Sequence, residues 1–101
     1  MAALQILIGL ITGKIEKVHD YVQVEFSDGT ILSIFNNYAY EGDSLLSIEG
    51  NIVIAVEESD KSVVIIFEGG KSLTVGLNDE DYNGPEAMVL RQEGKFPVIW
   101  N

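Results

Sequence analysis

Apolar and polar residues alternate along much of the chain, most clearly in the stretch 21–35, YVQVEFSDGTILSIF. An alternation with a period of two is the pattern of a half-buried β-strand. Asp28-Gly29 separates two such runs, and this pair is typical of a tight turn between antiparallel strands. The stretch therefore predicts a hairpin with a two-residue loop. A loop of this length sets the register of the two strands so that Val22 faces Phe35.

A second stretch, 63–75, repeats this pattern 41 positions later, with Gly69-Gly70 in the loop. A two-residue loop here puts Glu68 opposite Lys71, which is a favourable cross-strand charge pair. The repeat aligns Phe26 with Phe67, Leu32 with Leu73, and Ile34 with Val75. The chain is thus predicted to contain two repeated hairpin units, each forming one layer.

Weaker patterns predict the remaining elements. They are a buried first strand at 4–11, a short strand after Gly13 ending at a His19-Asp20 turn, a long connection at 36–50 with a brief strand or helical turn, strands at 51–58 and 62–68, a strand or helical turn at 86–92, and a last strand at 96–100. The run at 62–68 is apolar on both faces, which predicts a strand buried from both sides. Pro97 lacks an N–H and restricts the last strand to an edge. We expect one all-β domain spanning 1–101, an antiparallel β-sandwich or flattened barrel of about eight to ten strands.

The composition narrows the classes of partner. Six Lys and Arg against sixteen Asp and Glu give a formal charge of −10, and the chain has no cysteine. A phosphate backbone repels such a protein, so we expect no nucleic acid partner and favour a basic protein partner. The lack of cysteine excludes thiolate metal sites and thiol catalysis. The apolar start is too short to span a bilayer, and we expect a cytoplasmic protein that does not engage a membrane.

The predicted loops suggest where the acidic residues gather. If each connection reverses the chain direction, the loops 27–30, 58–61 and 78–85 lie at one end of the molecule, with only Lys61 to oppose their charge. Their candidate partner-binding residues are Asp28, Glu58, Asp60, Asp79, Glu80, Asp81 and Tyr82. An acidic surface with an aromatic side chain is suited to a basic groove on a partner.

Candidate chemistry is sparse. The chain has a single histidine, His19, in a predicted turn beside Asp20, so we expect no catalytic residues and no enzyme activity. The stretch 79–84, DEDYNG, matches the opening of a calcium-binding EF-hand loop, but Leu90 stands at the twelfth position, where a bidentate glutamate is required. We therefore expect no metal site and no cofactor, although weak Ca²⁺ binding by these carboxylates remains an alternative.

Tyr38 and Tyr40 lie two residues apart and share a face if this segment is extended. Two interpretations remain open for the pair. The tyrosines form a platform for a sugar or a partner, or they cover the edge of the core.

Three stretches, DYVQVEFSDGTILSI, NDEDYNGPEAMVL and the closing PVIW, resemble small all-β immunity proteins of contact-dependent growth inhibition and related polymorphic toxin systems. YNGPEA and PVIW are the most distinctive parts of this resemblance. It implies a non-catalytic inhibitor that binds one cognate bacterial toxin domain, often a basic nuclease, inside the producing cell. No binding residue of that family is carried over to this chain.

The alternative hypothesis comes from a different class of protein. It is a small β-sandwich module with a structural or ligand-binding role, which takes Ca²⁺ or a carbohydrate through Tyr38, Tyr40 and the acidic loop at 78–84. Under either hypothesis the last strand, 96–100, is an exposed edge through which two copies can pair into a homodimer.

Overall fold

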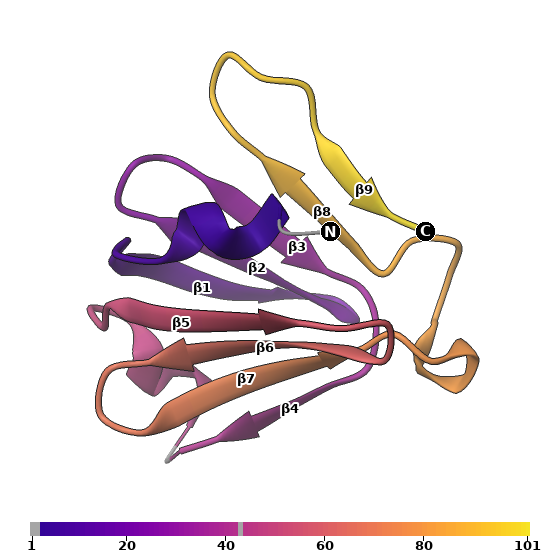
Figure 1. Ribbon diagram of the computed structural model, residues 1–101, viewed down its shortest axis with the longest axis horizontal. Helices are drawn as coiled ribbons and strands as arrows, with labels where there is room; N and C mark the ends of the chain where they lie inside the picture. The colour runs from indigo at the N-terminus through magenta and orange to yellow at the C-terminus, as the bar shows by residue number, and fades with distance from the viewer. Residues whose placement is uncertain (1–2, 43) are drawn as a thin grey trace.

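The computed structural model describes residues 3–42 and 44–101, and within these residues nine strands form two antiparallel sheets (Figure 1). The first sheet has the order β1 (Thr12–Val18), β2 (Tyr21–Phe26), β3 (Ile31–Ile34), β8 (Met88–Arg91), β9 (Val98–Trp100). The second has the order β4 (Tyr38–Glu41), β7 (Lys71–Gly76), β6 (Ser62–Phe67), β5 (Val53–Glu58). Three short 3₁₀ helices complete the described chain: η1 (Ala3–Leu7), η2 (Leu45–Ile48) and η3 (Asp79–Asp81). The predicted all-β class is confirmed.

The predicted repeat is also present, and it extends beyond the hairpins. An offset of 41 residues relates η1, β1, β2 and β3 to η2, β5, β6 and β7. An antiparallel bridge joins Ile11 to Ile52, its own counterpart in the repeat. The Ser27 N–H donates to the Ile11 carbonyl at 2.8 Å, and the equivalent Glu68 N–H donates to the Ile52 carbonyl at 2.9 Å. The two halves therefore lie around a pseudo-twofold axis close to this bridge.

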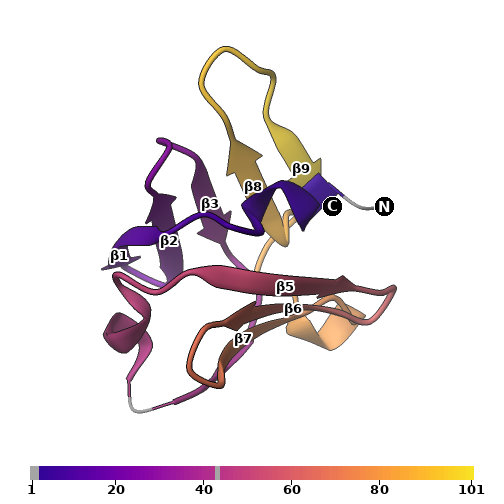
Figure 2. The ribbon, with the colours of Figure 1, turned by 60° about the vertical axis from the view of Figure 1, so that its left-hand side comes forward.

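The two halves exchange one strand each. After β3 the chain crosses to the second sheet, where β4 pairs with β7, and after β7 it crosses back, where β8 pairs with β3 (Figures 1 and 2). Tyr38 pairs with Val75 and Met88 pairs with Ile34, so β4 and β8 occupy matching places in the repeat. Through this exchange each sheet contains a strand from the other half of the chain. β9 is the one strand of the described chain without a counterpart in the repeat.

One core lies between the inner faces of the sheets. Its largest fully buried side chains include Phe67, Leu32, Ile65, Leu73 and Leu90. In β6 buried residues alternate with half-buried ones, so the prediction that 62–68 is covered on both faces is wrong. The alternation arises because no element of the described residues forms a layer over the outer face of the second sheet, and this face includes Val64 and Ile66.

The predicted register of the first hairpin is wrong by one residue. The Gly29 N–H donates to the Phe26 carbonyl at 2.9 Å, the Phe26 N–H donates to the Thr30 carbonyl at 2.8 Å, and only Gly29 of the loop has a positive φ, 89°. The loop therefore has three residues and needs a left-handed conformation at one position, not two. Val22 consequently pairs with Ile34 instead of Phe35.

The second hairpin shows the same shift. Lys71 pairs with Phe67, so the expected pair between Glu68 and Lys71 does not form. The Lys71 ammonium instead donates to the Asn51 side-chain oxygen at 3.1 Å. The predicted register is wrong in both hairpins for the same reason: each loop contains three residues where the pattern predicted two.

The remaining expectations meet mixed outcomes. The predicted strand at 4–11 is wrong: η1 forms there because Leu4 and Leu7 are both fully buried, and a spacing of three residues matches one turn of a 3₁₀ helix. The 36–50 connection contains both β4 and η2. The stretch 86–92 forms the strand β8, and β9 is an edge strand that begins directly after Pro97.

Asp28 stabilises the first hairpin in a way that depends on pH. Its Oδ1 accepts a hydrogen bond from the Thr30 N–H at 2.9 Å, and this bond lowers the pKa of the carboxyl below its usual 3.8. A lowered folded-state pKa gives stability that is present above the unfolded-state pKa and is lost as pH falls through the folded-state value. We expect Asp28→Ala to be less stable than wild type in urea at pH 7, with the difference vanishing well below pH 3.8. A constant difference at every pH would contradict this.

Candidate functional site

The structure brings six of the seven predicted partner-binding residues to one end of the molecule. Glu58 ends β5 and Asp60 lies in the β5–β6 turn. A hydrogen bond from the Leu77 N–H to the Lys61 carbonyl at 2.9 Å places this turn beside the segment that contains η3. Both lie on the right of Figure 1. We call this the acidic end, and its acidic residues are Asp20, Glu58, Asp60, Asp79, Glu80, Asp81 and Glu86.

Asp28 does not belong to the acidic end. Its loop is bonded to Ile11 and thereby lies beside Ile52, at the start of β5, whereas Glu58 ends that strand. Six residues of strand put about 20 Å between them. The predicted placement is wrong because the 36–50 connection contains β4, so the chain turns back once more before β5 than the prediction assumed.

Two of the predicted carboxylates are engaged inside the protein. Glu58 accepts hydrogen bonds at 3.3 Å from the Leu4 N–H and from the side-chain amide of Gln5, and these bonds fix the start of η1. Asp81 accepts the Asn78 N–H at 3.2 Å as part of the capping box of η3. Both carboxylates therefore position elements of the fold, which a loop sequence alone does not reveal.

Three other carboxylates of the acidic end are exposed and unbonded within the described structure. Asp60, Asp79 and Glu80 are exposed, and within the residues that the structure describes their side chains make no hydrogen bond or ion pair. The salt bridge found in that part of the chain joins Lys14 to Glu16 at 3.4 Å, on β1. Lys61 is the one cation that these loops contribute, so the acidic end keeps a large excess of negative charge.

Two hollows border two of these carboxylates, Asp60 and Asp79. One of about 300 Å³ lies between the β5–β6 turn and Trp100, with Glu58 and Asp60 on its rim. Another of about 430 Å³ is lined by Asp79, Tyr82 and Asn101, and both hollows share Leu77. Tyr82 is half-buried and donates its hydroxyl hydrogen to the Asn101 carbonyl at 2.9 Å. The acidic end is therefore an uneven surface with carboxylates beside aromatic walls.

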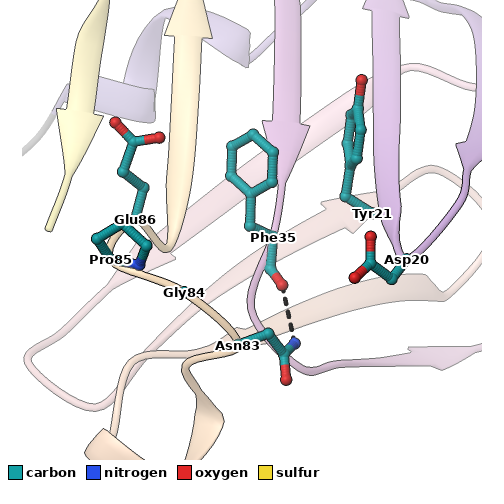
Figure 3. A pocket seen from close by; sticks show the side chains of 7 residues that line it. All are labelled: Asp20, Tyr21, Phe35, Asn83, Gly84, Pro85 and Glu86. Carbon is teal, nitrogen blue, oxygen red and sulfur yellow. Dashed lines mark hydrogen bonds between the residues drawn. The ribbon is translucent and has the colours of Figure 1, made fainter.

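A smaller pocket of about 140 Å³ opens on the outer side of the first sheet (Figure 3). The rings of Tyr21 and Phe35 lie side by side in it, with centroids 5.0 Å apart and planes tilted by 41°. Asp20 and Glu86 lie on either side of these rings. Carboxylates around an aromatic pair form a suitable site for a cationic side chain.

This pocket was not predicted from the sequence. The predicted register placed Phe35 opposite Val22, on the core face, whereas the true register brings it beside Tyr21 on the outer face. A one-residue shift reverses the face of every side chain in a strand. The three-residue hairpin loop is the feature that would have revealed this site.

Asparagines fix the segment 77–87 where the two strand crossings meet. The side-chain amide of Asn36 donates to the Gly76 carbonyl at 2.8 Å, and that of Asn83 donates to the Phe35 carbonyl at 2.9 Å. The Asn37 N–H also donates to the Asp81 carbonyl at 2.9 Å. These bonds hold the acidic segment to the sheets, so its carboxylates are presented from an anchored backbone.

The structure also places the other candidate groups that the sequence indicated. The calcium-like stretch 79–84 forms η3 and the turn after it, and the described residues contain no cluster of three or more His, Cys, Asp or Glu able to hold a metal. His19 is exposed in the β1–β2 turn, with φ 55°. Tyr38 and Tyr40 pack against the core, and the Tyr40 hydroxyl lies 2.8 Å from the Ser47 hydroxyl, which favours the interpretation that they cover the core edge.

Fold and site together define an all-β protein of two sheets that exchange one strand each, with an acidic end that contains several pockets. Comparisons with protein-family models, with curated proteins and with solved structures found no match for this chain. Among the described residues no helix has the length and apolar character needed to cross a membrane.

Proposed function

We propose that this chain is a non-catalytic binding protein whose acidic end docks onto a basic surface of a protein partner. The observation that carries the proposal is a set of unpaired carboxylates: Asp79 and Glu80 on the anchored segment 77–87, and Asp60 on the adjoining β5–β6 turn. Asp60 and Asp79 each border a hollow. With a net charge of −10, the protein attracts a basic partner over a distance and repels acidic ones. Such charges increase the rate and the specificity of association more than the final affinity.

The pocket of Figure 3 supplies a specific contact for this docking. Its aromatic pair, Tyr21 and Phe35, offers ring faces to a lysine or arginine side chain, and Asp20 and Glu86 offer carboxylates to the charged head. A cation over an aromatic ring gains about 0.5 to 2 kcal/mol. One basic side chain of the partner enters this pocket while others meet the free carboxylates of the acidic end.

The class of partner follows from the resemblance to immunity proteins. The partner is a cognate bacterial toxin domain, basic and of nuclease type, which this chain neutralises in the cytoplasm by covering its substrate-binding surface. Nucleases bind phosphate backbones through lysine and arginine, so their substrate groove is the surface that an acidic protein matches best. In this proposal the chain itself catalyses nothing and needs no cofactor.

The proposal predicts that binding depends on where the negative charge lies. The wild-type chain is used as bait for a basic, toxic partner, and the association rate is compared with that of the triple variant D60K/D79K/E80K. We expect association to slow roughly tenfold and to become less sensitive to salt, because the reversed charges remove the attraction. Surface plasmon resonance at several salt concentrations measures both quantities.

A matched variant separates charge position from total charge. E25K/E68K/E93K reverses three exposed glutamates outside the acidic end, and each triple variant changes the net charge by +6, from −10 to −4. We expect this variant to associate at close to the wild-type rate. Equal slowing of both variants, or of neither, would refute docking through the acidic end.

A further inference from the structure

The pseudo-twofold shows a place that is filled in one half of the molecule and open in the other. In the first sheet β9 pairs with β8, and Trp100 lies opposite Met88 with its side chain half-buried against the core. The matching strand of the second sheet is β4, in which Tyr38 takes the place of Met88. No described strand pairs with the far side of β4, which forms the free lower edge of the molecule in Figure 1.

The main chain of β4 presents unpaired groups along this edge. The Gly76 N–H donates to the Asn37 carbonyl at 3.1 Å, so these two opposed residues are a pair whose N–H and carbonyl point across the β4–β7 ladder. Because such pairs alternate in an antiparallel ladder, the main-chain groups of Tyr38 and Tyr40 point away from β7. The open edge therefore offers the N–H and C=O groups of two residues to another strand.

A hollow of about 400 Å³ lies beside this edge, lined by Ile15, Lys17, Tyr38, Ser44, Leu45 and Leu46. Leu46 is 59% exposed. In the other half, the residue equivalent to Leu45 is Leu4, which is fully buried. Leu45 itself is only half-buried, so at this place the second half is more open than the first.

We propose that the open edge of β4 accepts an extended segment of the basic partner as a fifth strand of the second sheet. The added strand pairs antiparallel with Tyr38–Glu41, as β9 pairs with β8, and a large apolar side chain opposite Tyr38 fills the hollow. This inference rests on the proposed function, since it names the part of the partner that the protein binds.

The charges around the edge define the chemistry of the segment. Exposed Glu41 lies at one end of β4, and the other end follows Asn37, which is bonded to the main chain of Asp81 at 2.9 Å and of Glu80 at 3.5 Å. Lys17 on the rim of the hollow disfavours a cation at the centre. The segment is therefore apolar in the middle and basic at both ends, and it continues the docking surface of the acidic end.

The test uses a synthetic peptide that places two arginines before and two after the sequence of Val98–Trp100. We expect saturable shifts in the amide NMR signals of Tyr38–Glu41 and Leu46, together with slowed hydrogen exchange of the Tyr38 and Tyr40 amides. Methylating the peptide nitrogen of the tryptophan, which faces β4, should abolish binding. Methylating that of the isoleucine, which faces solvent, should not. Shifts confined to the acidic end, or no saturation below about 1 mM, would overturn the inference.

Leu46→Arg tests the hollow without disturbing the core. It places a charge at the mouth of the hollow, and we expect it to weaken peptide binding at least tenfold. Ile54→Arg is the matched control, since Ile54 is 53% exposed on β5, and it should bind like wild type. If both variants bound the peptide equally well, the hollow would not be part of the peptide-binding site. A wild-type dimer that Leu46→Arg converts to a monomer would also overturn the inference, because a second copy would then occupy the edge.

The two proposals fail separately. Capture of a basic toxin that depends on Asp60 and Asp79, with no peptide bound at β4, would leave the acidic end as the docking surface and remove the strand site alone. Peptide binding at β4, with no basic partner captured by the whole protein, would remove the proposed function and with it the toxin as the source of the strand.

Discussion

Phe67→Ala is expected to lower the free energy of unfolding by about 3 to 5 kcal/mol, as truncation of a buried aromatic side chain usually does. Phe67 is 1% exposed, ends β6, and pairs with Val53 on one side and Lys71 on the other. The loss combines the apolar surface no longer buried with the cavity that remains. The total free energy of unfolding of a domain of this size is about 5 to 15 kcal/mol. We therefore expect a large fall in the urea concentration at which half of the protein is unfolded.

The chain provides two comparisons for this prediction. Phe26 is the counterpart of Phe67 in the repeat and is 2% exposed, so Phe26→Ala should cost a similar amount. Phe96 is 94% exposed in the β8–β9 loop, and Phe96→Ala should change stability by less than about 0.5 kcal/mol. If Phe67→Ala and Phe96→Ala had equal effects, the assignment of the core would be wrong.

The local patterns of the sequence were sufficient for the two central hairpins and for the repeat. Alternation with a period of two reports which face of a strand meets the core, and it does so wherever one face is buried and the other is not. For this reason the hairpins around Asp28 and Gly69 and the alignment of Phe26 with Phe67 were predictable. The 3₁₀ helix η1 was missed because an apolar run of this length fits a buried strand equally well.

Loop geometry was the first feature that the patterns left undetermined. A glycine with a positive φ is needed in both two-residue and three-residue hairpin loops, so Asp28-Gly29 is compatible with either. The difference is one residue of register, and that residue decides whether Phe35 lies in the core or beside Tyr21 on the surface. The pocket of Figure 3 depends on this choice.

The exchange of β4 and β8 between the sheets was the second such feature. Nothing in the alternation of 36–41 indicates which sheet the strand joins, because the buried face looks the same in either. The strand β4 also adds one reversal of the chain before β5, and for this reason Asp28 lies at the other end of the molecule from the β5–β6 turn. The grouping of Asp60 with Asp79 was nevertheless correct, since the second half from β5 to η3 alternates in direction as predicted.

Thr12→Val is expected to raise the free energy of unfolding by about 1 to 3 kcal/mol. The Thr12 side chain is fully buried, and its hydroxyl has no hydrogen-bond partner within the described structure. Burying a hydroxyl without a partner is unfavourable by this amount, and valine has nearly the same shape without the polar atom. Urea denaturation at neutral pH measures the gain.

The repeat provides the reason to expect that valine fits. Val53 is the counterpart of Thr12, it is also fully buried, and the main chains match: the Thr12 N–H bonds to the Asn51 carbonyl at 2.9 Å and the Val53 N–H bonds to the Leu10 carbonyl at 3.0 Å. Val53→Thr should therefore bury a second hydroxyl without a partner and lower the free energy of unfolding by a similar amount. If Thr12→Val destabilised the protein while Val53→Thr did not, the two sites would not be equivalent, and the pseudo-twofold would not extend to their packing.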